Sequence, residues 1–292
     1  MLIDCKTLSD NLKEQYKKEI ENNNYDINLI VIMVGNNPAS EVYVRNKQKS
    51  CEYVGIKTKT VRFNEDVTTE ELISNINIYN NDKTVNGVMV QLPIPKHLDA
   101  DAIINSIDPL KDVDGLTDTN MIKLQKGKYG IIPCTPKGII KILDSINFKY
   151  IGSDAVVLGR SDIVGKPIAK LLMDRGCTVT MCHSKTYDKT IYTSEVDLIV
   201  SSVGKPKFLS RSDLSYDREK QVIIDVGINR DENNKLCGDV DNSYYDIKGI
   251  TGHTIYEDSQ FLVTPVPKGV GPMTVTMLLE NTIEAYKLQN RI

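Results

Sequence analysis

A tyrosine and a lysine four residues apart, Tyr43 and Lys47, form the first pair in this sequence whose types and spacing could do chemistry. In a helix, residues at positions i and i+4 lie on one face, so an aromatic ring and an amine would line the same cleft. The ring could stack on a planar ligand, and the amine could transfer protons. The spacing also fits an amphipathic helix with a solvated lysine, because lysine is usually exposed. The pair alone leaves both interpretations open.

Polar residues at the end of a strand and in a turn form a second candidate set. Gln91 ends the apolar run Val85–Gln91, and ligand sites of α/β proteins gather at the carboxyl ends of strands. The turn Lys111–Gly115 contains Asp112 and Asp114 but lacks the remaining spaced ligands of a calcium loop. One carboxylate could accept two N–H donors from the edge of a ligand. A polar strand end and a plain turn remain the alternatives.

The segment DAVVLGRSDIVGKPIAKLL, residues 154–172, is the strongest local signal for a nucleotide site. An apolar strand runs into Gly159 and a helix begins near Gly165, where backbone N–H groups and the helix dipole favour an anion. A Walker A loop is excluded, because five residues instead of four separate the glycines and Pro167 replaces the magnesium-binding hydroxyl. As a dinucleotide loop the segment is a variant, since Ser161 stands where GxGxxG has its second glycine. A strand–helix turn that merely packs is the alternative.

The end of the next strand bears on the choice of cofactor. A Rossmann domain that uses NAD places a carboxylate there to bind the ribose 2′-hydroxyl. In this sequence the strand Thr178–Cys182 is followed by His183, Ser184 and Lys185, and Arg160 lies on the preceding loop. A hydroxyl and two cations suit a 2′-phosphate, which a carboxylate would repel. We therefore expect NADP rather than NAD.

Alternating helical and apolar strand patterns predict an α/β protein of two domains. Helices are expected at Leu8–Ile20, at Ser40–Val54 with Ser40 as N-cap and Gly55 as stop, at Lys137–Ser145 and at Met273–Leu288. Strands are expected at Asn28–Gly35, Val85–Gln91, Ala155–Gly159, Thr178–Cys182, Asp197–Val203, Gln221–Val226 and Gln260–Thr264. The breaker-rich stretch 127–136 separates an N-terminal α/β domain, residues 1–135, from a Rossmann domain, residues 136–272, with a doubly wound parallel sheet.

Composition excludes several classes of protein. The 292 residues carry 36 basic and 39 acidic side chains, a net charge of −3, which does not suit non-specific nucleic-acid binding. Neither a signal peptide nor an apolar run of membrane-spanning length is visible. The six cysteines form no CxxC pair, and the three histidines, His97, His183 and His253, lack zinc-site spacing. We expect a cytoplasmic protein with reduced thiols and without a metal, nucleic-acid or membrane partner.

Eight segments occur in a fixed order along the chain: VGNNPASEVYVRNKQK, VQLPIPK, DPLKDVDGLT, PCTPKGI, VVLGRSDIVGKP, CHSKT, IDVGIN and TPVPKGVGPMT. Together they resemble the bifunctional methylenetetrahydrofolate dehydrogenase/methenyltetrahydrofolate cyclohydrolase family, and the resemblance covers nearly the whole chain. It implies NADP-dependent oxidation of 5,10-methylenetetrahydrofolate, followed by hydrolysis of the methenyl product to 10-formyltetrahydrofolate. It also implies a homodimer.

The resemblance assigns residues as well. It implies that the folate cleft is lined by Tyr43, Lys47, Gln91 and Asp114. It implies NADP contacts at Gly159, Arg160, Ser161, Ser184 and Ile228. The loop Thr264–Thr274 would close the site, with Pro265, Gly269 and Val270 near the ligands; Lys268 stands where many members have glycine. The C-terminal helix, residues 273–292, would pack back on the first domain.

These assignments suggest a division of labour between the two reactions. The oxidation depends mainly on positioning against the nicotinamide. The hydrolysis needs a proton-transfer group, which we assign to Lys47, since burial and a cationic substrate favour its neutral amine. Gln91 would orient Lys47 without adding charge, Asp114 would accept paired N–H bonds from the pterin edge, and Tyr43 would pack on the folate.

Two other classes share part of the pattern. An NADP oxidoreductase of the shikimate-dehydrogenase type would have the same architecture and a catalytic lysine. A nucleotide-binding regulatory protein would keep the loop from Gly159 to Gly165 but would not need Tyr43, Lys47, Gln91 and Asp114 together.

Overall fold

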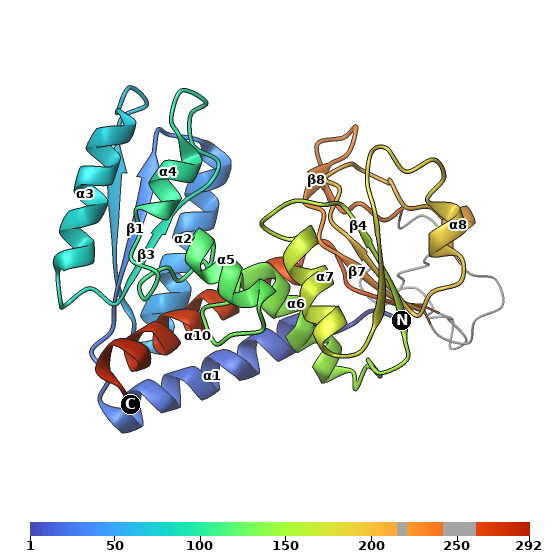
Figure 1. Cartoon of the computed structure of the whole chain (residues 1–292), viewed down its shortest axis with the longest axis horizontal. Coiled ribbons are helices and arrows are strands. Elements are labelled where there is room, and N and C mark those ends of the chain that lie inside the picture. Colours follow the sequence, from blue (N-terminus) through green and yellow to red (C-terminus); the bar gives the residue numbers. More distant parts are fainter. Residues whose placement is uncertain (215–220, 242–260) are drawn as a thin grey trace. The chain divides into compact units, whose positions relative to one another are not determined.

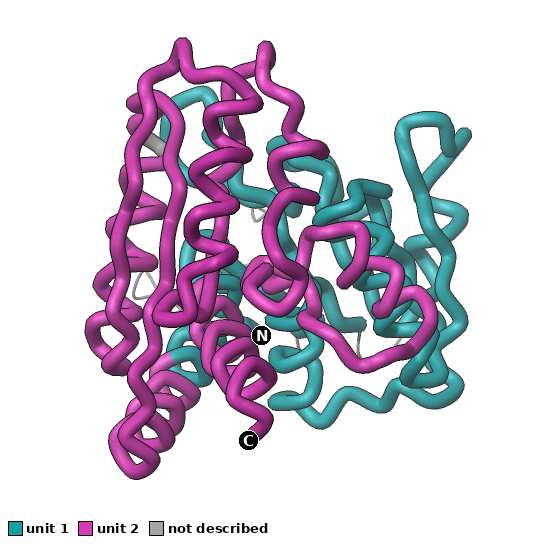
Figure 2. The backbone as a smooth tube through the Cα atoms, turned by 60° about the vertical axis from the view of Figure 1, so that its left-hand side comes forward, with its two compact units in different colours: residues 1–9, 135–274 teal, residues 10–134, 275–292 magenta. Residues whose placement is uncertain are grey.

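The computed structural model describes residues 1–214, 221–241 and 261–292. The chain forms two compact units (Figure 2): unit 1 comprises residues 1–9 and 135–274, and unit 2 comprises residues 10–134 and 275–292. The division expected from the sequence places residues 1–9 in the first domain. In the structure they belong to unit 1, because the Ile3 N–H donates to the Val263 carbonyl at 2.9 Å and Leu2 bridges to the same residue.

Unit 2 is built on a three-stranded parallel sheet in the order β2-β1-β3. The strands are β1 (Asn28–Val34), β2 (Lys57–Phe63) and β3 (Gly87–Val90). The prediction of β1 is confirmed, and β3 is shorter than the predicted Val85–Gln91. Strand β2 is not among the predicted strands, because its sequence KTKTVRF is half polar, as suits an edge strand with an exposed face.

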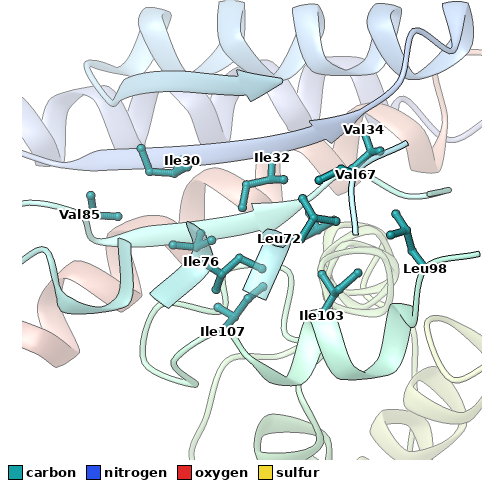
Figure 3. Close-up of a cluster of buried hydrophobic side chains, with 12 residues drawn as sticks. Ile30, Ile32, Val34, Val67, Leu72, Ile76, Val85, Leu98, Ile103 and Ile107 are labelled. Carbon is teal, nitrogen blue, oxygen red and sulfur yellow. The ribbon is translucent and has the colours of Figure 1, made fainter. Parts of the chain in front are cut away.

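The two faces of this sheet bury alternate residues, as the two-residue period of a strand requires. One face packs against α3 (Thr69–Asn81) and the segment around α4 (Ala100–Asn105) in an apolar cluster (Figure 3). The buried members of this cluster are Ile30, Ile32, Val34, Val67, Leu72, Ile76, Val85, Val88, Val90, Leu98, Ile103 and Ile107. The other face carries Met89, whose sulfur lies 3.7 Å from the amine of Lys47, a residue of the helix between β1 and β2.

That helix is α2 (Pro38–Val54). The prediction of Ser40 as its N-cap is wrong, because the helix begins at Pro38 and the Asn37 side chain accepts a hydrogen bond from the Ser40 N–H at 3.2 Å. Proline suits a first helical position, since its missing N–H has no intrahelical partner there. Gly55 follows the helix with φ +90°, as the predicted stop requires.

Three further helices complete unit 2: most of α1 (Cys5–Asn23), α5 (Asp118–Gln125) and most of α10 (Val270–Asn290). The Tyr16 hydroxyl of α1 donates to Glu280 of α10, and the Gln289 amide donates to the Asn86 carbonyl at 2.8 Å. The prediction that the C-terminal helix packs on the first domain is therefore confirmed.

Unit 1 contains a five-stranded, fully parallel sheet in the order β10-β7-β6-β4-β5. Its strands are β4 (Asp154–Leu158), β5 (Thr178–Cys182), β6 (Leu198–Ser201), β7 (Gln221–Asp225) and β10 (Phe261–Val263). All five predicted strands are present within one to two residues, and Gln260 lies outside the described residues. Because β4 is flanked by β5 and β6, the chain reverses its winding between β4 and β6, which is where doubly wound sheets bind nucleotides.

The helices of unit 1 include α6 (Cys134–Ser145), α7 (Gly165–Asp174) and α8 (Thr190–Thr193), with a short 3₁₀ turn at Arg211–Asp213 (Figure 1). Strands β8 (Asn229–Arg230) and β9 (Leu236–Cys237) form a small hairpin. Over the parts of the chain described, no helix is both long enough and apolar enough to cross a membrane.

Candidate active site and cofactor loop

Lys47 and Gln91 meet on the face of the unit 2 sheet that α2 covers. The Lys47 amine donates to the Gln91 side-chain oxygen at 3.0 Å, and each residue is only 9% exposed. The Gln91 amide nitrogen donates to the Leu92 carbonyl at 2.6 Å, which leaves the amide oxygen facing the lysine. The sequence places these two residues 44 positions apart, and the packing of α2 on the sheet brings them into contact. A buried amine thus has a neutral, oriented acceptor.

Asp114 completes a charged cluster with Lys47. Burial raises the pKa of the Asp114 carboxyl, while the positive charge of Lys47 opposes this rise and the negative charge of Asp112 adds to it. The Cys134 thiol also interacts with this carboxyl, and it donates to the Val113 carbonyl at 3.3 Å. The structure therefore brings together an amine, an amide oxygen and a carboxylate, all predicted from the sequence as site residues.

The neighbours of Asp114 in the KDVDG turn have a different task. The Asp112 carboxylate, 1% exposed, accepts hydrogen bonds from the backbone N–H groups of residues 115–117 at 2.8–3.2 Å and from Asn120 at 2.9 Å. The Lys111 amine donates to three carbonyls of the segment 79–82 at 2.7–2.9 Å, and burial lowers its pKa. These two side chains fix the turn, and the ligand contact expected of Asp114 stays a prediction.

Asn281 of α10 holds this turn from the other side. Its side-chain amide, fully buried, donates to the Val113 and Ile132 carbonyls at 2.9 Å each. The sequence analysis assigns this residue no role. An asparagine at a position where the apolar stripe of the C-terminal helix continues is the signal that could have found it, because a buried amide must have partners.

Tyr43 and Cys51 lie one helical turn before and after Lys47 on α2. Tyr43 is 37% exposed, and partial burial raises the pKa of its hydroxyl. Cys51 is fully buried, and burial raises the pKa of its thiol to about 12. The exposed ring is available to a planar ligand, whereas the thiol stays neutral and packs.

The phosphate loop of unit 1 depends on close approach between strand and helix. A Cβ atom on Gly165 would lie 2.4 Å from the Gly159 carbonyl oxygen, so only glycine allows α7 to start this close to the end of β4. The Ser161 hydroxyl accepts hydrogen bonds from the N–H groups of Val164 and Gly165 at 3.2 and 3.3 Å. Ser161, expected as a cofactor contact, thus also shapes the helix start. The turn fits a phosphate group at a helix N-terminus.

Arg160 and Ser184 follow two neighbouring strands at the carboxyl edge of the sheet. Leu158 of β4 pairs with Cys182 of β5, and the two exposed residues each follow their strand by two positions. The turn after β5 is fixed by a hydrogen bond of 3.1 Å from the Lys185 N–H to His183 Nδ1 and by one of 2.9 Å from the His183 N–H to the Thr186 hydroxyl. Cation and hydroxyl at this edge suit a 2′-phosphate.

The other expected ligand contacts follow β7 and β10. Ile228, after β7, is 50% exposed and offers an apolar side chain to a ligand. In the loop after β10, a Cβ on Gly269 would lie 2.2 Å from the Pro265 carbonyl oxygen, and Val270 begins α10. Lys268 takes φ +82°, the left-handed conformation that glycine adopts most easily.

Metal-binding clusters are absent from the described residues: no group of three or more His, Cys, Asp or Glu side chains is arranged to hold an ion. His97 Nε2 donates to the Val67 carbonyl at 3.1 Å, a structural contact. His253 lies outside the residues that the structure describes.

Two family models match this chain in succession. The model for the catalytic domain of tetrahydrofolate dehydrogenase/cyclohydrolase matches residues 3–114, and the model for its NAD(P)-binding domain matches residues 133–290. The chain belongs to the tetrahydrofolate dehydrogenase/cyclohydrolase family. The resemblance noted from the eight segments is confirmed.

Individual relatives extend over the whole chain. The bifunctional protein FolD of Agathobacter rectalis is 45% identical over 289 residues, which cover 98% of this chain and 99% of that protein. The crystal structure of the bifunctional FolD dehydrogenase/cyclohydrolase of Campylobacter jejuni is 41% identical, with a TM-score of 0.90 over 100% of this chain and 99% of that one. A Trypanosoma brucei FolD structure with NADP cofactor and inhibitor is 30% identical, with a TM-score of 0.88 over 100% and 99%.

Proposed function

We propose that this protein oxidises 5,10-methylenetetrahydrofolate with NADP⁺ and hydrolyses the resulting 5,10-methenyltetrahydrofolate to 10-formyltetrahydrofolate. Membership of the family and the bifunctional relatives support the pair of reactions. One observation supports the assignment of residues above all: the Lys47 amine and the Gln91 side-chain oxygen form a buried hydrogen bond of 3.0 Å. Asp114 interacts electrostatically with the same lysine.

The oxidation needs orientation more than acid–base chemistry. Removing a hydride from the methylene bridge leaves a cation shared by two folate nitrogens, so the substrate itself stabilises the charge. Bound NADP⁺ would supply the acceptor for this hydride. Asp114 accepts two N–H bonds from the pterin edge and Tyr43 packs on the folate, which together orient the bridge.

The cofactor fits the residues of the phosphate loop. Gly159 and Gly165 let the chain pack closely at the start of α7, because a Cβ on either would collide with backbone, and the N–H groups of that helix start suit a phosphate. Arg160 and Ser184 would bind the 2′-phosphate, Ser161 would contact the cofactor from the loop, and Ile228 would pack against it. Pro265, Gly269 and Val270 would lie near the ligands.

The hydrolysis needs a proton acceptor and a proton donor. Water attacks the methenyl carbon and loses a proton to the neutral amine of Lys47. The C–N bond to one folate nitrogen then breaks as the ammonium of Lys47 returns a proton to that nitrogen, and the remaining hydroxyl proton leaves to solvent as the formyl C=O forms. Gln91 holds the amine in place without adding charge, whereas a carboxylate there would favour the ammonium.

A spectrophotometric assay of the purified protein tests the proposal. Oxidation of methylenetetrahydrofolate is followed with NADP⁺ and with NAD⁺, and hydrolysis of methenyltetrahydrofolate is followed separately without cofactor. We expect both activities, with NADP⁺ preferred. Hydrolysis without oxidation would overturn the cofactor assignment in unit 1, and the absence of both activities would overturn the proposal as a whole.

We also propose that the protein works as a homodimer, as the family resemblance implies, and that it lies in the cytoplasm, as its pattern of cysteines indicates. Light scattering coupled to size exclusion distinguishes the mass of two chains from that of one. Fractionation of cells, with antibody detection of the protein, tests the location.

A further inference from the structure

Two aspartates at the carboxyl edge of the unit 1 sheet have no role in the proposed chemistry. Asp225 ends β7 and is 2% exposed, and Asp239 follows β9 and is fully buried. Burying a carboxylate is costly unless hydrogen bonds replace the water it loses. Burial raises the pKa of Asp225 to about 7, with the charge of Asp239 adding to the rise and backbone hydrogen bonds opposing it. The location of this pair therefore needs an explanation.

Asp239 accepts five hydrogen bonds from two different loops. The loop after β6 contributes the Val203 N–H at 2.6 Å, the Gly204 N–H at 3.2 Å and the Lys205 N–H at 3.0 Å. The Ser201 hydroxyl, at the end of β6, donates at 3.1 Å. The loop after β7 contributes the Asn229 amide at 2.9 Å. One carboxylate thus fastens both loops.

Asp225 fastens the second loop and the segment that carries Asp239. Its carboxylate accepts the Gly227 N–H at 3.0 Å, the Asp239 N–H at 2.9 Å and the Val240 N–H at 3.0 Å. Its own N–H donates to the Thr264 hydroxyl at 2.8 Å, at the start of the loop after β10. Three loops are therefore connected through this pair.

Glycines make this arrangement possible. A Cβ on Gly227 would lie 2.2 Å from an Asp239 carboxylate oxygen, and a Cβ on Gly238 would lie 1.8 Å from an Asp225 carboxylate oxygen. Each carboxylate therefore occupies space that any side chain at the facing position would fill. In the segments 225–227 (DVG) and 238–239 (GD), the glycine of each segment therefore leaves space for the carboxylate of the other.

One loop held by the pair carries a proposed cofactor contact, and another packs on the phosphate loop. Ile228 lies between Gly227, bound to Asp225, and Asn229, bound to Asp239. The loop after β6 packs on the phosphate loop: a Cβ on Gly159 would lie 2.6 Å from the Ser202 carbonyl oxygen, and the Ser202 hydroxyl donates to the Leu158 carbonyl at 3.0 Å. The two aspartates thus lie behind the surface that would meet NADP.

We infer that Asp225 and Asp239 are positioning residues of the NADP site, which hold the loops 202–205 and 227–229 at the carboxyl edge of the sheet in the shape that receives the cofactor. This inference rests on the proposed function. It assigns to the pair a role in cofactor binding and oxidation and none in the hydrolysis.

The test is the variant Asp239→Asn in the full-length protein. An amide keeps the volume but replaces one acceptor oxygen with a donor that faces backbone N–H groups. We expect the Kd for NADP⁺, measured by calorimetry, and the KM for NADP⁺ to rise at least about tenfold. Hydrolysis of methenyltetrahydrofolate without cofactor should stay within about twofold of the unmodified protein.

The matched control is Asp197→Asn in the same sheet. The Asp197 carboxylate also accepts a backbone N–H, that of Asp154 at 2.8 Å, but at the amino-terminal edge. We expect this variant to leave the Kd for NADP⁺ unchanged. An equal loss of NADP⁺ affinity in both variants would show a general effect on the unit and would overturn the inference.

A second variant keeps the inference testable if Asp239→Asn does not fold. Asn229→Ala removes one hydrogen bond to Asp239 and leaves the carboxylate pair intact, and we expect about a threefold rise in the Kd for NADP⁺. If the unmodified protein oxidises methylenetetrahydrofolate but neither variant changes its affinity for NADP⁺, the positioning role is wrong. If the unmodified protein itself does not oxidise this substrate with NADP⁺, the proposed function fails instead.

Discussion

In unit 2, Lys47 and Gln91 are each 9% exposed and lie on a helix and at a strand end, in direct contact with each other. In unit 1, Arg160 and Ser184 are exposed, Ile228 is 50% exposed, and all three lie on loops. The proposed proton-transfer group, Lys47, is thus buried and held by its own side-chain partner. The expected cofactor contacts face solvent and are held through the backbone behind them.

The difference follows from the chemistry of each ligand. A proton moves only over a short distance and between groups of matched basicity, so the amine must be fixed and shielded from water. A dinucleotide has phosphates and flat rings, which bind to backbone N–H groups and exposed side chains. The protein therefore does not need buried charged groups at this site before the cofactor binds. In unit 1 the buried charges, Asp225 and Asp239, lie behind the loops instead.

The largest expected effect separates the two reactions. In Lys47→Met, hydrolysis should fall about 10³-fold, because general acid–base catalysis contributes about 10² to 10⁴. Oxidation should survive within about tenfold, since it needs positioning rather than proton transfer. Both rates are measured on one preparation. Lys49→Met, an exposed lysine on the same helix, serves as the control. Equal loss of both activities would contradict the division of labour.

A substitution of Asp114 should have a smaller effect, which is equal for the oxidation and the hydrolysis. Asp114→Asn removes one acceptor and the charge from the pair of pterin contacts, and we expect the KM for both folate substrates to rise about 10- to 100-fold. The KM for NADP⁺ should not change. The control Asp118→Asn alters an exposed carboxylate in the first turn of α5. A rise confined to hydrolysis would show that Asp114 acts through Lys47 instead of the pterin.

A substitution in the cofactor loop should change the preference for NADP⁺ over NAD⁺ and leave the hydrolysis unchanged. Arg160→Gln removes a cation from the expected 2′-phosphate site, so the ratio of kcat/KM for NADP⁺ to that for NAD⁺ should fall about tenfold. Hydrolysis should be unaffected. Arg175→Gln, at the opposite end of α7, is the control. An unchanged ratio would move the 2′-phosphate contact to other residues.

The smallest expected effect is a dependence of folate binding on pH. Because burial raises the pKa of Asp114, its carboxyl takes up a proton at a higher pH than an exposed aspartate does. Protonation removes an acceptor, so the Kd for tetrahydrofolate should rise a few-fold as the pH falls through that pKa. Calorimetry at a series of pH values measures this rise. Asp114→Asn should bind weakly and lose this dependence; a dependence that persists in the variant would assign it to another group.

The strands of unit 1 could be predicted because buried parallel strands are continuous apolar runs, and the phosphate loop because two glycines flank a helix start. The edge strand β2 and the short α4 could not, since neither has an apolar run long enough to distinguish it. Ser40 looked like an N-cap by type, but Asn37 takes that role because the helix starts two residues earlier. Local pattern determines that a helix forms better than it determines where it begins.

The sequence by itself determined the family, the two domains and the types of the residues proposed to act, since motif order and spacing carry that information. Only the tertiary structure distinguished the two aspartates of the KDVDG turn: Asp112 is bound by the backbone of residues 115–117, whereas the charge of Lys47 acts on Asp114, which makes Asp114 the one proposed to bind a ligand. It also decided the roles of Asn281 and Asp239. Their partners lie on segments distant in sequence, and a hydrogen bond between such segments has no local pattern because it depends on how the chain packs.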